Sequence, residues 1–528
     1  MSRIQYITLA IPYANGAMHI GHAYEAIGGD CLARFFRADG YDVRFQAGMD
    51  EHGQKVAQNA EKVGQTPLES ATACANEYQE LLKTYAISND DFIRTTDQKR
   101  HWPTVQEIWR RMEAAGDIYL GEYSGWYSVR DEAFYDESEL TKAGEGKFLS
   151  PQGTPVEWVT EKSYFFKLSK YQDKLLKLYE DKPDWIQPSY RRNEIVSFVK
   201  GGLRDLSISR TTFDWGIPVP SNNKETNADH VMYVWVDALT NYISCLGALT
   251  NDDSAYKKYW EQGNPIQVIV KDISRFHTVY CPAFLMSAGL PLPNFVHVHG
   301  FINDKQGRKF SKSEGNFPWS IMEFADKFGV DRIRYFLMRE VSYGRDGNLE
   351  LDQLPIRCNA DLANEFGNLS QRSLSMINKN CDGKMPQPGE LTAEDKAALE
   401  APQKVLPVMR DAMNRLEFHN ALSALWKVMS ETNGYFAGQE PWALKKINPE
   451  RMNTVLWVTA NCVRQLAILA SPFIPIGTAA ILDQLKVSPA ERSFSCLAAN
   501  VVAGVELPAP LGAYPRLVLE VSDDEGSK

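Results

Sequence analysis

Two histidines three residues apart are the first group in the chain whose types and spacing could do chemistry. His19 and His22 follow the turn-forming segment 12–16, PYANG. A helix is expected to begin near His19, which places both imidazoles on one face of its first turn. Helix starts bind anions through unpaired N–H groups and the positive end of the dipole, and imidazoles add donors. The pattern predicts a phosphate site, although a lone histidine pair at this spacing is more often structural.

A second group of charged and hydroxyl side chains lies between two glycines at 307 and 315. This segment contains Lys309, Ser311, Lys312 and Ser313. By itself, such a loop is usually a solvated surface turn. Neither GxGxxG nor GxxxxGK[ST] occurs at the histidine pair, so its sequence supports neither a dinucleotide site nor a P-loop. If the loop and the histidines bind one anion, the lysines supply positive charge to it.

The segments on either side of the histidine pair predict the elements that position it. Residues 4–11 are a nearly continuous apolar and β-branched run, typical of a strand buried on both faces of a parallel sheet. After residue 18, apolar residues recur at helical spacing up to about residue 40. Residues 42–50 predict a second parallel strand that ends at Asp50, and ligands of open α/β sheets bind at such strand ends.

Composition indicates an ordinary globular protein of several domains. Its 528 residues are 44% apolar and 23% charged, and no run of 18 apolar residues occurs. No signal-peptide pattern precedes the first strand, so we expect a cytoplasmic protein without a membrane partner. The net charge of −10 argues against a polyanion partner but does not exclude a local basic face. The eight cysteines are scattered without CxxC, as expected for buried thiols in a reducing compartment.

The two motifs and their flanks resemble a known family. Residues 19–22, HIGH, and 309–313, KFSKS, are similar to the HIGH and KMSKS motifs of class I aminoacyl-tRNA synthetases. The flanking sequence resembles the methionyl-tRNA synthetases from residue 4 to about residue 480, and Phe310 stands where that family usually has Met. The similar segments are AIPYANG (10–16), GYDVRFQAGMDEHGQK (40–55), YVWVDALTNY (233–242), VKDISRFH (270–277) and HVHGFI (297–302).

The resemblance implies a two-step reaction on methionine, ATP and tRNA(Met). Methionine would first be activated to methionyl adenylate with release of pyrophosphate, and the methionyl group would then pass to the tRNA. Mg²⁺ would accompany ATP rather than occupy a protein cage. The implied catalytic residues are His19, His22, Lys309 and Lys312, and the implied ATP-binding residues are these four with Gly21, Ser311 and Ser313.

The resemblance also implies a methionine site at the strand ends. Asp50 would pair with the α-ammonium group, and aromatic faces would pack on the polarisable thioether. Without the resemblance, the aromatic spacing in segment 233–242 is more often that of a helix core. The implied methionine-binding residues are Ala10, Ile11, Tyr13, Asp50, Trp235, Tyr242, Ile273 and His277.

Residues 116–225 differ in texture from the segments around them and predict an inserted domain. They are rich in Tyr, Trp, Gly and turn residues, followed by a charged helix expected near 164–179. Many members of the family carry a zinc knuckle in this insertion. Here residues 102–229 contain neither Cys nor His, so a tetrahedral thiolate or imidazole site cannot be built from them. We predict no structural zinc and no other protein metal site.

From about residue 355, helical patterns separated by Pro and Gly predict a helix bundle. In the family, this bundle reads the anticodon. Asn368 and Arg372, four apart on one helix, resemble anticodon contacts. Trp442 resembles the aromatic residue that stacks on an unstacked anticodon base. Without the resemblance, a tryptophan in the core of the bundle is an equal alternative.

The expected fold class is α/β. A Rossmann-like parallel-sheet catalytic domain is split by an inserted domain and followed by an all-α anticodon-binding bundle. No additional C-terminal domain of the kind with which some relatives dimerise is recognised, so we expect a monomer. The expected ranges are 1–115 and 226–302 for the catalytic domain, 116–225 for the insertion, 303–355 for the lysine loop and stem-contact region, 356–520 for the bundle and 521–528 for a disordered tail.

Two other functions share part of this pattern. A small-molecule nucleotidylyltransferase has a similar histidine turn but would lack the lysine loop and a long helical domain. A non-catalytic tRNA-binding module would be expected to have lost His19, His22 or Lys312, all of which are present. Both alternatives predict the absence of amino-acid-dependent pyrophosphate exchange.

Overall fold

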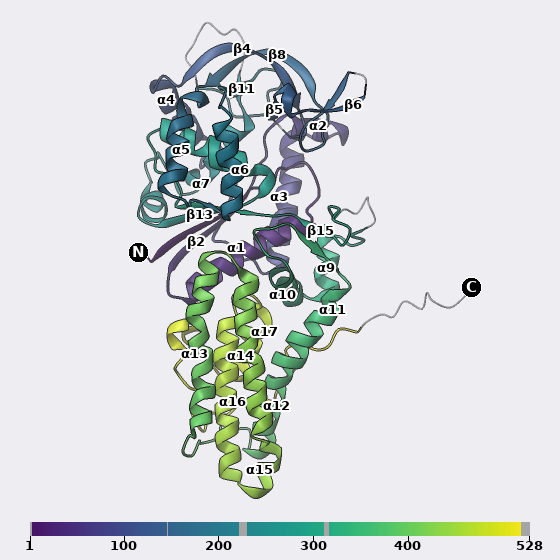
Figure 1. The fold of residues 1–528 in the computed structure, drawn as a ribbon, viewed down its shortest axis with the longest axis vertical. Helices are drawn as coiled ribbons and strands as arrows, with labels where there is room; N and C mark the ends of the chain where they lie inside the picture. Colours follow the sequence, from purple (N-terminus) through teal and green to yellow (C-terminus); the bar gives the residue numbers. More distant parts are fainter. Residues whose placement is uncertain (1–2, 132, 145, 221–229, 311–315, 519–528) are drawn as a thin grey trace, which may run out of the picture. The chain divides into compact units, whose positions relative to one another are not determined.

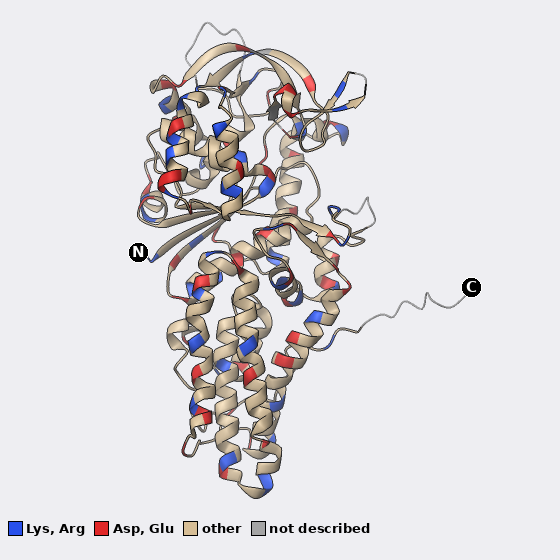
Figure 2. Cartoon of the chain, viewed as in Figure 1, with Lys and Arg blue, Asp and Glu red and all other residues tan. Residues whose placement is uncertain are grey.

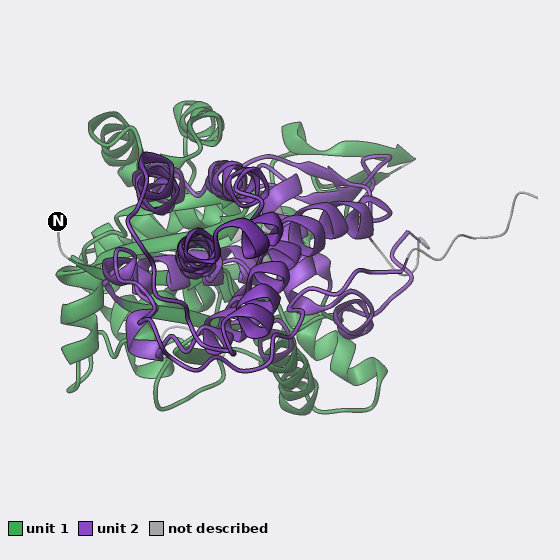
Figure 3. Ribbon diagram, turned by 90° about the horizontal axis from the view of Figure 1, so that it is seen from below, with its two compact units in different colours: residues 1–18, 43–81, 89–299 green, residues 19–42, 82–88, 300–528 purple. Residues whose placement is uncertain are grey.

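The computed structural model describes residues 3–131, 133–144, 146–220, 230–310 and 316–518. The expected tail at 521–528 lies outside these residues, as do Ser311, Lys312 and Ser313. The chain divides into two compact units, coloured separately in Figure 3. Unit 1 comprises residues 1–18, 43–81 and 89–299, and unit 2 comprises residues 19–42, 82–88 and 300–528. Each unit is described by itself.

Unit 1 is built on a six-stranded sheet with the order β3-β2-β1-β13-β14-β9. The pairs β1–β13, β13–β14, β14–β9 and β2–β3 are all parallel, which confirms the predicted α/β class. The central strands are almost completely buried because helices pack on a parallel sheet. The strands are β1 (Ile4–Leu9), β2 (Asp42–Met49), β3 (Asp91–Arg94), β9 (Ile186–Gln187), β13 (Asn264–Val270) and β14 (Phe295–His299).

The helices of unit 1 include two that carry or support predicted site residues. Helix α7 (Val234–Ser244) contacts helix α4 (Trp102–Ala114), and both contact α8 (Cys281–Ser287). Helix α7 is buried along nearly its whole length, which explains its apolar sequence. Figure 1 shows the remaining helices of this unit: α2 (Gln54–Lys62), most of α3 (Pro67–Thr84), α5 (Gln172–Asp181) and α6 (Ser189–Lys200).

The region predicted as an insertion contains a second, antiparallel sheet with the order β10-β8-β4-β5. Its strands are β4 (Ile118–Ser128), β5 (Ala133–Tyr135), β8 (Glu157–Phe166) and β10 (Leu206–Ser207). The predicted helix near 164–179 is therefore wrong at its start: residues 164–166 belong to β8, which pairs with β4, and α5 begins at Gln172. Cross-strand pairing over ten residues outweighs the local helical pattern. Strand β9, also from this region, joins the edge of the parallel sheet.

Unit 2 begins with α1 (Ile20–Ala38), whose N-cap is His19, so the predicted helix start is confirmed. A buried ion pair ties this helix to α10 (Val330–Glu340). The guanidinium of Arg334 donates to Asp30 at 2.7 Å and to the carbonyl oxygens of Tyr85, Pro472 and Phe473. Both charged side chains are fully buried and hydrogen-bonded, as burial requires. The N-terminal histidines therefore lie on a helix that is fixed within unit 2.

The remainder of unit 2 is largely helical, as predicted from about residue 355. Helices α13 (Ala393–Asn414), α14 (Phe418–Gly438) and α16 (Pro449–Ala470) run side by side (Figure 1). Lys, Arg, Asp and Glu are interspersed along the bundle (Figure 2). The other elements are β15 (Ile302–Asp304), β16 (Gly347–Leu349), α9 (Ile321–Phe328), α11 (Gln353–Cys358), a π-helical segment (Asn359–Gly367), α12 (Asn368–Asn380), α15 (Pro441–Ile447) and α17 (Pro475–Gln484). Among the described residues, no helix combines the length and apolarity needed to cross a membrane.

Candidate active site

The two histidines at the start of α1 form a stacked pair. Their ring centroids are 3.8 Å apart and the planes are inclined by 16°. Nδ1 of His19 accepts the backbone N–H of Gly21 at 3.1 Å, and Nδ1 of His22 accepts the backbone N–H of His19 at 3.2 Å. Because each Nδ1 is an acceptor, each neutral ring carries its proton on Nε2. The helix start therefore presents two imidazole N–H donors of defined tautomer.

The environment of the pair keeps both rings neutral near pH 7. Burial and the nearby charge of Lys309 lower the pKa of His19 to about 4. Burial, His19 and Lys309 together lower the pKa of His22 well below its usual value. A bound anion would reverse the effect of the positive neighbours. Unit 2 thus brings together four of the predicted ATP residues: His19, Gly21, His22 and Lys309.

Asp304 holds the two described ends of the lysine loop together. Its carboxylate accepts the Arg308 backbone N–H at 2.8 Å and the Asn316 side-chain amide at 2.9 Å. That amide also donates to the carbonyl oxygen of Lys309 at 3.1 Å. These hydrogen bonds lower the pKa of Asp304 to about 2 despite the opposing effect of desolvation. Asp304 therefore holds the two described ends of the loop, at Arg308 and Asn316, close together.

Phe310, the departure from the family motif, is buried at the base of this loop. Its ring packs edge-on against Phe317, with centroids 5.7 Å apart. Phe317 in turn contacts Trp319 and Phe324. A large apolar side chain at 310 is thus accommodated by an aromatic cluster within unit 2. The change from Met leaves the two lysines of the motif in the sequence.

In unit 1, the loop after β1 lies against the end of β2. The backbone N–H of Asp50 donates to the carbonyl of Pro12 at 2.9 Å, and that of Ala14 donates to the carbonyl of Asp50 at 2.8 Å. Tyr13 and Asp50 form an isolated parallel bridge. Ala10, farther back on the same segment, is bonded to β13 through Val268. The structure thus places Asp50 directly beside Tyr13, one of the predicted residues of this segment.

The predicted aromatic residues of α7 meet the segment that follows β13. The hydroxyl of Tyr242 lies 2.6 Å from Nε2 of His277, whose Nδ1 lies 3.0 Å from the carbonyl oxygen of Ile273. Because a carbonyl only accepts, Nδ1 carries the imidazole proton and Nε2 accepts from Tyr242. Burial lowers the pKa of His277 to about 4, so the ring is neutral. These three residues form one hydrogen-bonded set.

Sequence reasoning missed Phe276, which stacks on Trp235 with centroids 3.8 Å apart and planes inclined by only 3°. The sequence does contain a signal, since Phe276 directly precedes His277 within the similar segment 270–277. Sequence reasoning also missed Asp237, His52 and His101, which form a buried hydrogen-bonded chain in the same unit. Their connection depends on residues far apart in sequence.

The predicted anticodon residues lie on two helices of the bundle. The guanidinium of Arg372, on α12, lies 5.4 Å from the ring centroid of Trp442, at the start of α15, and 5.3 Å from that of Phe436. Trp442 is 45% exposed, so it is not a residue of the bundle core. Asn368 is exposed one helical turn before Arg372. The arrangement offers an aromatic face and a cation together at the surface.

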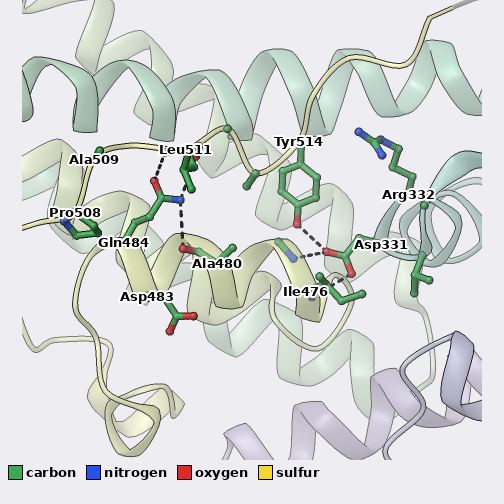
Figure 4. Close-up of a pocket in the computed structure, with 15 residues that line it drawn as sticks. Asp331, Arg332, Ile476, Ala480, Asp483, Gln484, Pro508, Ala509, Leu511 and Tyr514 are labelled. Carbon is green, nitrogen blue, oxygen red and sulfur yellow. Dashed lines mark hydrogen bonds between the residues drawn. The ribbon is translucent and has the colours of Figure 1, made fainter. Parts of the chain in front are cut away.

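A cavity of about 560 Å³ in unit 2 is lined by none of the predicted site residues. It lies between α17, the start of α10 and residues 508–514 (Figure 4). The carboxylate of Asp331 there accepts backbone N–H groups of Ile476 and Gly477 and the hydroxyl of Tyr514. These bonds join the chain segments around the cavity. No cluster of three or more His, Cys, Asp or Glu residues suited to a metal occurs in the part of the chain that the structure describes.

Comparison with known proteins agrees with this geometry. Residues 5–374 match the family model of class I tRNA synthetases (M), and residues 385–523 match that of the anticodon-binding domain of methionyl tRNA ligase. The chain is 55% identical to the methionine–tRNA ligase of Rhizobium meliloti (strain 1021) over 97% of its own length and 98% of that protein. It is 48% identical to the enzyme of Mycobacterium bovis over 97% of both chains.

The structural comparison gives the same result. The Mycobacterium tuberculosis methionyl-tRNA synthetase bound by methionyl-adenylate superposes with a TM-score of 0.92 at 48% identity, covering 97% of this chain and 100% of that one. The apo form of the same protein gives 0.86 at 45% identity, covering 98% of both chains. All three comparisons indicate the same family: the two family models match successive parts of the chain, the relatives match over nearly its full length, and the fold is the same. The chain belongs to the methionine–tRNA ligase family of class I aminoacyl-tRNA synthetases.

Proposed function

We propose that this chain activates methionine with ATP to methionyl adenylate and transfers the methionyl group to tRNA(Met), for both initiation and elongation. The observation that carries the proposal is the stacked pair of His19 and His22 at the start of α1, beside Lys309. This is a site for phosphate, built from donors that are neutral when empty and surrounded by positive potential. The family of the chain supplies the substrates that such a site would serve.

In the first step, a methionine carboxylate oxygen attacks the α-phosphorus of ATP and the bond to pyrophosphate breaks. No side-chain nucleophile is required, so the chain's contribution is to position reactants and stabilise negative charge. We assign the Nε2–H groups of His19 and His22 and the ammonium of Lys309 to the phosphate oxygens. Lys312 adds a second positive charge, and Gly21, Ser311 and Ser313 complete the ATP site. Mg²⁺ enters with ATP.

For methionine, we assign the α-ammonium group to Asp50. The thioether is assigned to the aromatic surfaces of Trp235 and Tyr242, which are polarisable partners for sulfur. His277 holds Tyr242 in place, a role supported by their 2.6 Å hydrogen bond. The remaining walls of the site are assigned to Ala10, Ile11, Tyr13 and Ile273. Phe276, stacked on Trp235, is added to this set.

In the second step, the acyl group moves from the adenylate to the terminal ribose of the tRNA. We assign recognition of the anticodon to Asn368, Arg372 and Trp442. The Trp442 ring is exposed, and the guanidinium of Arg372 lies near it. Both features support this role, because an unstacked base can stack on an aromatic ring and hydrogen-bond to a guanidinium.

Four further properties belong to the proposal. We propose a cytoplasmic protein, since none of its eight cysteines forms a disulfide. We propose a monomer and no structural zinc, which light scattering and metal analysis of the purified protein would test. The absence of Cys and His from residues 102–229 supports the proposal of no structural zinc. The proposed domains are those expected from the sequence: 1–115, 116–225, 226–302, 303–355, 356–520 and 521–528.

The test is ATP–pyrophosphate exchange with each of the twenty amino acids in turn. Exchange that depends on methionine, followed by methionyl transfer to tRNA(Met), is the expected result. Exchange without any amino acid but with another small acceptor would indicate a nucleotidylyltransferase. tRNA binding without exchange would indicate a non-catalytic module. Leucine and norleucine are the informative competitors, because an apolar pocket discriminates a small change in side chain by only about 1–3 kcal/mol.

A further inference from the structure

A chain of buried polar side chains in unit 1 is not used by the proposed reaction. Asp237, in the first turn of α7, is 1% exposed. One carboxylate oxygen lies 2.6 Å from Nδ1 of His52 and the other lies 2.6 Å from Nε2 of His101. Nδ1 of His101 lies 2.7 Å from Oγ of Ser244, at the end of the same helix. One carboxylate thus joins three elements: the exit of β2, the N-cap of α4, and α7.

These hydrogen-bonded residues are close in sequence to both parts of the proposed methionine site. His52 follows Asp50 by two residues at the end of β2. Asp237 follows Trp235 by two residues and precedes Tyr242 by five on α7. The residue assigned to the ammonium group and those assigned to the thioether therefore lie on different elements. The Asp237–His52 contact connects these two elements, and the Asp237–His101 contact ties α7 to α4.

Other contacts of the loop after β2 hold the ring of His52 and the backbone on both sides of it. Its ring packs edge-on against Trp215, with centroids 5.3 Å apart. The indole N–H of Trp215 donates to the carbonyl oxygen of Glu51 at 2.7 Å, and the N–H of Gly53 donates to the carbonyl of Trp215 at 3.2 Å. Because these contacts join His52 and its neighbours to one another, a displacement of the imidazole would also displace the loop.

The two hydrogen bonds to Asp237 require that its carboxylate be ionised. Burial alone would raise the pKa of Asp237, but the electrostatic interaction with His52 and the hydrogen bonds from both imidazoles outweigh it and hold the pKa below its usual value. Since an ionised carboxylate only accepts, Nδ1 of His52 and Nε2 of His101 carry the protons that face it. Charge-assisted bonds of this kind are among the stronger hydrogen bonds in proteins.

We infer that Asp237 is a positioning residue for methionine: by binding His52 and His101, it fixes α7, with Trp235 and Tyr242, against the strand end that carries Asp50. The inference rests on the proposed function, which assigns the last three residues to the substrate. A shift of about 1 Å between groups that bind one small molecule can cost roughly 100-fold in rate. Asp237 therefore matters most for methionine and little for ATP.

The test uses the full-length chain and its pyrophosphate exchange, with methionine and ATP varied separately. Asp237→Ala removes both acceptors and is expected to raise KM for methionine by about tenfold or more, with KM for ATP changed by less than about twofold. Asp237→Asn keeps the size and one acceptor oxygen, and its amide can donate to the other imidazole after a tautomer change. Its effect is therefore expected to be smaller than that of alanine.

A matched control separates positioning from general stability. Asp117 is also fully buried in unit 1, where its carboxylate accepts from Lys170, Tyr171 and Ser287. Asp117→Asn is expected to lower Tm but to leave KM for methionine unchanged. If Asp237→Ala does not fold, Ser244→Ala removes only the last link and is expected to raise KM for methionine by about two- to fivefold, again with KM for ATP unchanged.

Two results would overturn the inference. One is an unchanged KM for methionine in the folded variants. The other is an equal rise in KM for methionine and ATP that accompanies a loss of Tm like that of Asp117→Asn. Both differ from failure of the proposed function, in which the wild-type chain itself would show no methionine-dependent exchange.

Discussion

The imidazole rings of His19 and His22 lie nearly parallel, 3.8 Å apart, with both Nδ1 atoms occupied by backbone N–H donors of the same helix start. At this separation, protonation of one ring disfavours protonation of the other. The pair is therefore a neutral donor site when empty. A phosphate that binds to it supplies negative charge and favours protonation of the same rings.

Histidine titration checks this electrostatic account. In the ligand-free protein, His19 is expected to titrate at about pH 4 and His22 well below 6.5. Tripolyphosphate is expected to raise both pKa values, as measured by ¹H–¹⁵N spectra of the side chains. His277, whose pKa is also about 4, is the control that should not respond. A pKa at or above 6.5 for either ring of the empty pair would contradict the account.

The same lowered pKa values predict how stability depends on pH. Unfolded imidazoles take up protons as the pH falls below about 6.5. His19 does so only near pH 4 in the folded protein, so the unfolded state binds more protons in between. The pair's contribution to the free energy of unfolding is therefore full above pH 6.5 and declines as the pH falls towards 4. Denaturant unfolding at several pH values, compared with His19→Gln, measures this contribution.

Gly21→Ala is expected to disturb His19 directly. A Cβ atom at position 21 would lie 3.0 Å from both Cε1 and Nδ1 of the His19 ring. The ring must move by a few tenths of an ångström, which weakens its bond to the residue 21 N–H. We expect adenylate formation to slow by about tenfold, with methionine affinity unchanged. Gly434→Ala, whose Cβ would meet nothing within 4 Å, is the control; equal rates for both variants would count against a catalytic His19.

Lys312→Ala is expected to slow adenylate formation by orders of magnitude. Its ammonium is assigned to charge that develops on the phosphates in the transition state, which methionine binding does not involve. Rapid-quench measurement of adenylate and equilibrium binding of methionine separate the two effects. The exposed Lys305, nearby in sequence, supplies the control variant Lys305→Ala. Exchange rates equal to the wild type in Lys312→Ala would remove this lysine from the mechanism.

Trp442→Ala is expected to weaken tRNA charging while sparing pyrophosphate exchange. Loss of one stacked base costs about 1–3 kcal/mol, which is roughly a 5- to 150-fold rise in KM for tRNA. Ile447→Ala is the matched control, because that side chain is 79% exposed on the same helix, α15. Equal losses in charging and exchange would mean that Trp442 is structural.

Tyr242→Phe is expected to leave Nε2 of His277 buried without its 2.6 Å donor. An unsatisfied buried acceptor costs about 1–3 kcal/mol, so the free energy of unfolding should fall by that amount and KM for methionine should rise. Tyr256→Phe is the control, since the Tyr256 hydroxyl is buried with no hydrogen-bond partner among the described residues. Similar stability changes in the two variants would argue against the assigned hydrogen bond.

Local patterns in the sequence were sufficient to predict the strand before the histidine pair and the helix that begins at it. The run of β-branched residues in 4–11 and the helical spacing after residue 18 each depend on neighbours within a few positions, and β1 and α1 confirm them. The helical character of the chain after residue 355 was predictable for the same reason. Similar motifs also indicated the family, because HIGH and the lysine loop each occupy consecutive residues.

Only the tertiary structure decided which distant residues meet. The sequence around residues 164–166 predicts a helix, but these residues form the end of strand β8. Strand β4, some forty residues earlier, pairs with β8 over the whole length of β8. The partners of Asp237 come from positions 52 and 101, and neither spacing nor periodicity relates them to it. Periodicity reports contacts within one element, whereas pairing between strands and hydrogen bonds between buried side chains depend on how the elements pack.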